Sequence, residues 1–265
     1  MDGILLVNKP AGMTSHDVVN RIRKILHTKK VGHCGTLDPD ATGVLVLCIG
    51  KATKALQFLM SETKVYQATL FLGTATDTYD SSGQIMEEKA FHGVRDVEET
   101  LQSFIGKQQQ IPPIYSAIKV HGKKLYEYAR NQEHVDIQPR TIMIEKIELI
   151  FQQDQSITFQ VKCSKKLGYP AHMTHLIRLA SGEFYLEDCY SLEDIEQGHY
   201  QFMSLEDAFQ HFEHYFIDDE NIVYHGKKIK SDIDHQVVVC NQNHKVLAVY
   251  GPDGEGYLKS IRGLF

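Results

Sequence analysis

Between Ile157 and Cys163 the sequence "ITFQVKC" alternates apolar and polar residues without interruption. A period of two is that of a β-strand, whose successive side chains point to opposite faces. Ile157, Phe159, Val161 and Cys163 therefore belong to one apolar face of a sheet. This feature requires a fold built around at least one half-buried sheet, and the rest of the chain has to supply its neighbours.

Helical and extended patterns are mixed along the remaining sequence. "TSHDVVNRIRKIL" opens with Thr14-x-x-Asp17, a capping-box pattern, and spaces Val18, Ile22 and Ile25 along one helical face. Apolar or β-rich runs predict further strands at 4–7, 44–49, 64–73 and 140–163. Helical spacing predicts helices at 51–60, 97–106, 191–197 and 204–212, and one after the Pro pair within 110–130. The layout predicts an α+β fold in two domains, 1–216 and a small β-rich domain 217–265.

Composition and cysteine usage are typical of a globular protein in a reducing compartment. The chain has 265 residues, 42% hydrophobic and 23% charged, and its five cysteines form no CxxC pair. The first residues lack a basic segment before their short apolar run, and no stretch reaches the ~18 apolar residues that span a bilayer. We expect a cytoplasmic protein with neither a leader nor a membrane anchor.

Charge is distributed unevenly. The formal net charge is -6, but residues 181–225 hold twelve Asp and Glu and no Lys or Arg, which leaves +6 on the rest of the chain. Residues 1–60 carry eight Lys and Arg against four Asp. An acidic total argues against a nucleic-acid partner, whereas local basic patches permit one. A solvated surface with one acidic flank is the simpler interpretation of charge alone.

Several familiar chemistries lack a sequence signal. No GxGxxG, GxxxxGK[ST] or GxSxG motif occurs, so dinucleotide, P-loop and serine-hydrolase functions have no support. Histidine pairs at 172/175 and 211/214 have helical spacing, but the cysteines stand apart, and we expect no metal site.

The segment "GHCGTLDPDATGVLVLCIG" places Asp38 between a glycine-rich turn and an apolar run. Asp before Pro commonly begins a turn, so a turn or capping carboxylate is one interpretation. The loose D-x-D-x-T pattern from Asp38 to Thr42 also fits an aspartyl phosphatase, although that motif directly follows an apolar strand. The residues alone leave these alternatives open.

Five segments in order carry a more specific signal: "LLVNKPAGMTSHDVVNRIRK", "VGHCGTLDPDATGVLVLCIGKATK", "YQATLFLGTATDTYDSSG", "QIPPIYSAIKVHGKKLYEYAR" and "AHMTHLIRL". Together they closely resemble the bacterial tRNA pseudouridine-55 synthases of the TruB family. The resemblance runs from residue 4 to about residue 216. The remainder, ending "YLKSIRGLF", is more weakly similar to that family's PUA-type RNA-binding domain.

The resemblance implies a mixed-sheet pseudouridine synthase domain that isomerises uridine 55 of the tRNA T-loop without a cofactor. The reaction breaks a C–N glycosidic bond and rejoins the base through carbon, and a carboxylate can assist by attack or by stabilising an electron-poor centre. By resemblance Asp38 is the catalytic residue, His33 helps to hold the flipped-out base, Tyr66 stacks on that base, and Leu176 lines the pocket. Read without the resemblance, His33 is also compatible with a turn histidine, and Tyr66 and Leu176 with ordinary core residues. The expected partner is the tRNA T-arm, bound by a monomer.

One departure from the family pattern affects the site. The family continues from Cys-Ser-Lys into Gly-Thr-Tyr-Ile-Arg-Thr-Leu, whose Arg pairs with the catalytic Asp and whose Tyr lines the pocket. Here Lys165 is followed directly by Lys166, and about a dozen residues, roughly three helical turns, are missing. Because the sequence on both sides keeps the family pattern, omission of a disordered segment is the favoured explanation, and a real deletion is the alternative. A real deletion makes a non-catalytic tRNA-binding or tRNA-folding protein the alternative function.

Overall fold

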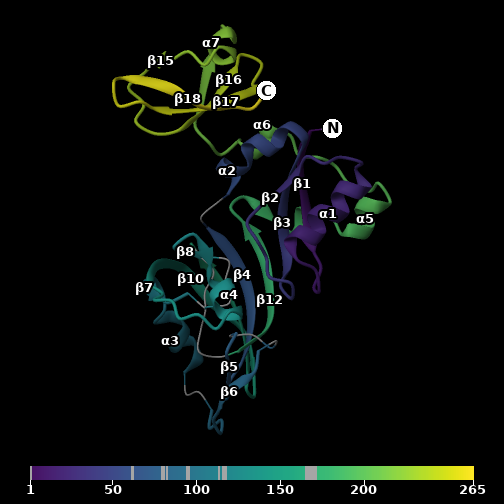
Figure 1. Ribbon diagram of the computed structural model, residues 1–265, viewed down its shortest axis with the longest axis vertical. Coiled ribbons are helices and arrows are strands. Elements are labelled where there is room, and N and C mark those ends of the chain that lie inside the picture. The colour runs from purple at the N-terminus through teal and green to yellow at the C-terminus, as the bar shows by residue number, and fades with distance from the viewer. Residues whose placement is uncertain are drawn as a thin grey trace. The chain divides into compact units, whose positions relative to one another are not determined.

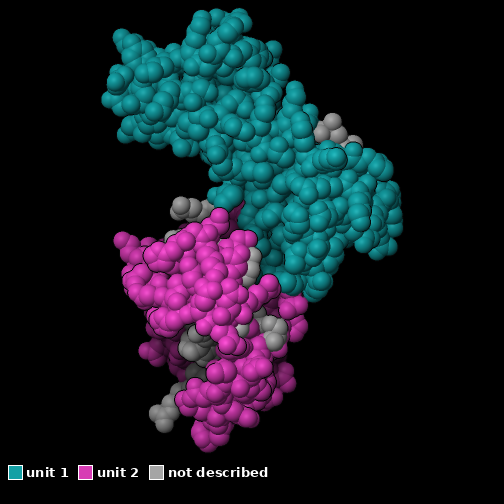
Figure 2. Space-filling model, in the orientation of Figure 1, with its two compact units in different colours: residues 1–39, 44–60, 187–265 teal, residues 40–43, 61–186 magenta. Residues whose placement is uncertain are grey.

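The computed structural model describes residues 2–60, 63–78, 81, 83–93, 96–112, 114, 118–164 and 172–265. These residues form two compact units, coloured separately in Figure 2. Unit 1 comprises residues 1–39, 44–60 and 187–265, and unit 2 comprises residues 40–43 and 61–186. The mixed helices and sheets of both units confirm the predicted α+β class.

The first part of unit 1 contains three strands at one end of the nine-stranded sheet that the described residues form, with helices beside them (Figure 1). Strand β3 pairs with β1 on one side and antiparallel with β2 on the other. The elements are β1 Gly3–Lys9, α1 Ser15–Ile25, β2 Val31–Cys34, β3 Thr42–Ile49, the 3-10 helix η1 Gly50–Ala55, α2 Leu56–Leu59, η2 Leu186–Asp188, α5 Leu192–Glu196 and α6 Leu205–Ala208. The first two residues of β3 belong to unit 2, and so does the first residue of η2.

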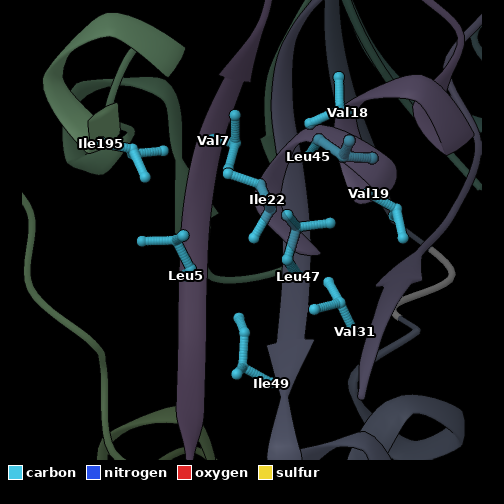
Figure 3. Packing of buried hydrophobic residues seen from close by; sticks show 10 residues of the cluster. All are labelled: Leu5, Val7, Val18, Val19, Ile22, Val31, Leu45, Leu47, Ile49 and Ile195. Atoms are coloured by element: carbon cyan, nitrogen blue, oxygen red, sulfur yellow. The ribbon is translucent and has the colours of Figure 1, made fainter. Parts of the chain in front are cut away.

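Helix α1 forms the core of this part with the strands. Its N-cap Thr14 and Asp17 make the predicted capping box, since each side chain bonds the other residue's backbone N–H. Val18 and Ile22 are fully buried and belong to one apolar cluster with Leu45 and Leu47 of β3, as Figure 3 shows. The residues spaced at the helical period in the sequence are therefore those that pack against β3. This packing holds the start of α1 next to β3.

The last part of unit 1 is β-rich, as the sequence predicts. Its five strands lie in the order β14-β16-β17-β18-β15 around a separate apolar cluster that includes Val239, Leu247 and Tyr250. The elements are β14 His214–Ile217, α7 Asn221–Tyr224, β15 Ile229–Lys230, β16 Val237–Asn241, β17 Val246–Pro252 and β18 Tyr257–Gly263. The domain boundary at 216/217 falls inside β14 and stays a prediction.

Unit 2 is built on a mainly antiparallel sheet in the order β12-β4-β11-β10-β7. The alternating residues Ile157 to Cys163 lie on β11, and all four apolar members are buried, which confirms the predicted sheet face. The elements are β4 Lys64–Phe71, β5 Thr74–Thr76, β6 Ile85–Glu88, α3 Val97–Gln102, β7 Gly106–Gln110, β8 Lys119–Val120, β9 Lys123–Lys124, α4 Leu125–Arg130, β10 Arg140–Gln153, β11 Ser156–Cys163, β12 His172–Ser181 and β13 Phe184–Tyr185.

Four predicted helices have different bounds in the structure. The segment 204–212 is helical only over α6, and after the Pro pair the hairpin of β8 and β9 precedes the short α4. Residues 50–55 form a 3-10 helix before the single α-helical turn α2, so the prediction of one helix over 51–60 was only partly right. Helix α3 ends at Gln102 rather than reaching residue 106. Gly106 instead begins β7, which pairs with β10, so strand pairing decides the end of this segment.

Candidate active site

Asp38 lies in the loop that joins β2 to β3, the motif the sequence analysis singled out. Its side chain is half-buried, and it follows a short turn rather than a strand end. His33 lies on β2, opposite Leu47 of β3, and is also half-buried. Both predicted residues therefore belong to one strand-loop segment of unit 1, in which β2 is held to β3 by pairing.

The residue after Asp38 is held through its backbone. The ammonium of Lys9, which is fully buried, donates hydrogen bonds to the carbonyl oxygens of Pro10, Met13 and Pro39 at 2.8, 2.6 and 2.9 Å. The Pro39 carbonyl also accepts a bond from the Gly12 N–H at 3.0 Å. A buried ammonium of this kind is stable only when its N–H donors have acceptors. The three hydrogen bonds of Lys9 therefore tie the Asp38 loop to the β1–α1 turn.

The residue before Asp38 is held by a second buried side chain. The Ser15 hydroxyl accepts a hydrogen bond from the Leu37 N–H at 2.8 Å and donates to the Leu37 carbonyl at 3.1 Å. Ser15 and Leu37 are 2% and 3% exposed. Backbone groups on both sides of Asp38 are thus bonded to the β1–α1 segment.

The other two predicted site residues share a face of the sheet in unit 2. Tyr66 and Ala68 of β4 lie opposite Arg178 and Leu176 of β12. Directly opposed residues of an antiparallel pair point to the same side, and so do residues two apart on one strand. The structure therefore brings Tyr66 and Leu176 together on one face, with Arg178 beside both.

Arg178 is a residue of this face that sequence reasoning missed. Its side chain is 1% exposed, and its guanidinium carbon lies 5.8 Å from the centre of the Tyr66 ring. Burial raises the pKa of the Tyr66 phenol, and the charge and hydrogen bond of Arg178 partly oppose that rise. The available signal was a charge inside the apolar stretch "HLIRLAS", but only the pairing with β4 gives it a place beside Tyr66.

The Asp38 motif ends in a glycine, Gly43, and the structure gives the reason. It has φ +102°, and a β-carbon built on it would lie 2.2 Å from the Arg178 carbonyl oxygen. Gly43 is the parallel partner of Arg178 in the pairing of β3 with β12. The close approach of these two backbones in unit 2 therefore requires glycine.

The described part of the chain gathers no group of three or more His, Cys, Asp or Glu side chains that could hold a metal ion. His214 begins β14 and makes a hydrogen bond to the Phe209 carbonyl oxygen through its ring at 3.0 Å. Neither histidine pair with helical spacing lies on a helix, because His172 and His175 belong to β12 and α6 ends at Ala208, before His211. Within the same part of the chain, no helix has the length and apolar character needed to cross a membrane.

The junction Lys165-Lys166 lies outside the described residues. The full sequence joins the two lysines directly and has 265 residues throughout.

Comparison with known proteins identifies the family. The profile described as "TruB family pseudouridylate synthase (N terminal domain)" matches residues 23–167, more than half of the chain. The tRNA pseudouridine synthase B of Bacillus cereus (strain ATCC 10987 / NRS 248) is 41% identical over 299 aligned positions, covering 100% of this chain and 97% of the relative. The protein of the same description from Bacillus subtilis (strain 168) is 49% identical over 217 positions, covering 74% of this chain and 70% of the relative. An alignment longer than the 265 residues of the chain means that the first relative has residues without a counterpart here.

Solved structures share the fold. A chain of the crystal structure of a Cbf5-Nop10-Gar1 complex has a TM-score of 0.74 at 22% identity, with 99% of this chain and 85% of that chain covered. A chain of an H/ACA RNP bound to a substrate RNA containing 2'-deoxyuridine has a TM-score of 0.72 at 21% identity, with 99% and 85% covered. Full-length similarity to the curated relatives, with this fold, places the chain in the TruB family of pseudouridylate synthases, whose reaction is the isomerisation of uridine to pseudouridine.

Proposed function

We propose that the chain converts uridine 55 in the T-loop of tRNA to pseudouridine, with Asp38 as the catalytic carboxylate. The observation that carries this proposal is the position of Asp38: half-buried, in a loop whose flanking backbone is bonded on both sides. Such a loop holds the backbone that carries the carboxylate in a defined position, and covalent or electrostatic assistance at a ribose or base centre depends on such positioning. The tRNA substrate is supported by the description of the relatives as tRNA pseudouridine synthase B.

The remaining site residues have roles in holding the extruded base. The target uridine is stacked in the T-arm, so it has to be flipped out at a cost of about a few kcal/mol. In the proposal Tyr66 stacks on the flipped base, Leu176 lines the same pocket, and His33 helps to keep the base out of the stack. Two observations support these roles. Tyr66 and Leu176 share one face of the sheet, and His33 lies on the strand before the Asp38 loop.

We also propose that a single chain acts, in the cytoplasm and without a cofactor. All five cysteines are free thiols, as is usual for proteins of a reducing compartment. The β-rich C-terminal part, proposed as a PUA-like domain over 217–265, adds an RNA-binding surface.

The aspartyl phosphatase alternative loses its structural basis, because Asp38 does not directly follow a strand.

The second candidate function is that of a non-catalytic tRNA-binding or tRNA-folding protein. It is favoured by one observation: the chain lacks the family segment between Lys165 and Lys166 that supplies the arginine partner of the catalytic Asp. Without that cation the ionised carboxylate is less well oriented.

One experiment separates the two candidates. An unmodified tRNA transcript is incubated with the protein, pseudouridine is mapped by position, and binding is measured in parallel. Pseudouridine at position 55 alone supports the proposed enzyme. Binding with no pseudouridine at any position contradicts it and supports the second candidate, and pseudouridine at other positions contradicts the assignment to the T-loop.

A further inference from the structure

The Ser15 hydroxyl makes two hydrogen bonds that the start of a helix does not require. Helix α1 is already capped by Thr14, whose side-chain oxygen accepts a bond from the Asp17 N–H at 3.0 Å. Ser15 is the first helical residue, and its hydroxyl is directed instead to the Leu37 backbone, 22 positions further along the chain. The two contacts satisfy one N–H and one C=O immediately before Asp38.

Those two bonds restrict the backbone next to the carboxylate. The peptide between Leu37 and Asp38 contains the carbonyl that accepts from Ser15, so rotation of that peptide breaks the 3.1 Å bond. Rotation about the other side of Leu37 breaks the 2.8 Å bond from its N–H. Because Ser15 and Leu37 are buried, water cannot readily replace either bond.

Lys9 and Gly12 hold the opposite side of Asp38 through the Pro39 carbonyl. Pro39 also has a φ fixed by its ring. Ser15 therefore supplies the restraint on the N-terminal side of Asp38, where the chain comes from the half-buried turn at Gly35 and the exposed Thr36. Loss of these two bonds removes a restraint on the N-terminal end of the Asp38 peptide.

We propose that Ser15 is a positioning residue for Asp38: its hydroxyl orients the Leu37–Asp38 peptide so that the carboxylate has one productive direction. The inference rests on the proposed catalytic function of Asp38. Ser15 itself exchanges no proton with the substrate, and its effect is transmitted through the backbone.

The test compares three substitutions at one position in the full-length chain. Ser15→Ala removes both bonds, Ser15→Cys keeps the shape with a weak donor and acceptor, and Ser15→Thr keeps the hydroxyl. Under single-turnover conditions with an unmodified tRNA transcript, we expect the rate constant to fall about 10- to 100-fold in Ser15→Ala, because small misplacement of a reacting group is costly. Ser15→Thr should recover most of the rate, Ser15→Cys should fall between, and RNA affinity should be unchanged in all three.

Thr14→Ala is the matched control on the neighbouring residue. It removes the helix cap at a cost of about 1 kcal/mol of folding free energy but leaves the Leu37 bonds in place. We expect a wild-type single-turnover rate constant in this variant. A purely structural effect of Ser15 would lower the reaction amplitude at an unchanged rate constant, and that result overturns the inference.

Hydrogen exchange supplies a readout that does not depend on turnover. In the peptide that contains Leu37 and Asp38, Ser15→Ala should lose amide protection and Thr14→Ala should keep it. Equal protection in the two variants would overturn the inference even if the protein formed no pseudouridine. Turnover retained by Asp38→Asn would instead contradict the proposed function, so the two failures are distinguishable.

Discussion

At the scale of single residues, the candidate site depends on buried polar groups that have defined partners. Lys9 satisfies three carbonyl oxygens and Arg178 packs on the Tyr66 ring, and both side chains are removed from water. The sequence predicted Asp38, His33, Tyr66 and Leu176 through a family resemblance, and their individual roles stay predictions. Arg178 and Ser15 escaped notice because burial and long-range hydrogen bonds depend on which strands and loops meet.

The buried phenol of Tyr66 gives a prediction for alkaline stability. Its pKa is raised above 10.0 in the folded chain, chiefly by burial. Folding therefore favours the protonated phenol, and this contribution is fully present below the unfolded pKa of about 10 and is lost as pH rises above it. Urea unfolding of the wild type and Tyr66→Phe at several pH values should show the free energy of unfolding falling more steeply above pH 10 in the wild type. Parallel curves from pH 8 to 11 would contradict the burial of an un-ionised phenol.

At the scale of elements, local patterns predicted strands and capped helices well. The capping box of α1, the alternation of β11 and the apolar run of β3 are all observed. Prediction was less accurate where tertiary pairing competes with local spacing. Val97, Leu101, Phe104 and Ile105 have helical spacing, yet the chain leaves the helix after Gln102 so that β7 can pair with β10.

The parallel pairing of β3 with β12 can be tested at Gly43. Gly43→Ala adds both a strained φ and a contact of 2.2 Å with the Arg178 carbonyl oxygen. We expect a loss of about 2 to 4 kcal/mol in the free energy of unfolding, measured by chemical denaturation. Gly106→Ala is the matched control, because Gly106 has φ +106° but nothing within 4 Å of the added carbon. Equal losses in the two variants would show that the close approach to Arg178 costs nothing.

At the scale of the whole molecule, the distribution of charge along the chain bears more directly on tRNA binding than the net charge does. The formal charge of -6 arises from an acidic stretch at 181–225, and the other residues sum to +6. Sequence analysis recovered the α+β class and the β-rich C-terminal part because both follow from hydrophobic periodicity. It could not give the strand order β12-β4-β11-β10-β7, because that order depends on pairing between segments far apart in the chain.

The salt dependence of tRNA binding tests this distribution. Phosphate contacts release condensed counterions, so affinity should fall steeply between about 50 and 200 mM salt despite the acidic total. Replacement of Lys29 and Lys30, both in the basic first 60 residues, by Gln should make that dependence shallower. Replacement of the exposed Glu187 and Glu193 by Gln in the acidic stretch is the control and should not make it shallower. A dissociation constant insensitive to salt over this range would contradict binding through phosphates.

The most direct test of the account is single-turnover conversion of unmodified tRNA by the wild type and by Asp38→Asn. The amide is nearly the same size as the carboxylate and keeps the loop, but it cannot act as a carboxylate nucleophile. Pseudouridine at position 55 and tRNA affinity are measured for both proteins. The account predicts that the wild type forms pseudouridine at this position and that Asp38→Asn binds tRNA equally well but forms none. Conversion by Asp38→Asn at the wild-type rate, or none by the wild type, would contradict it.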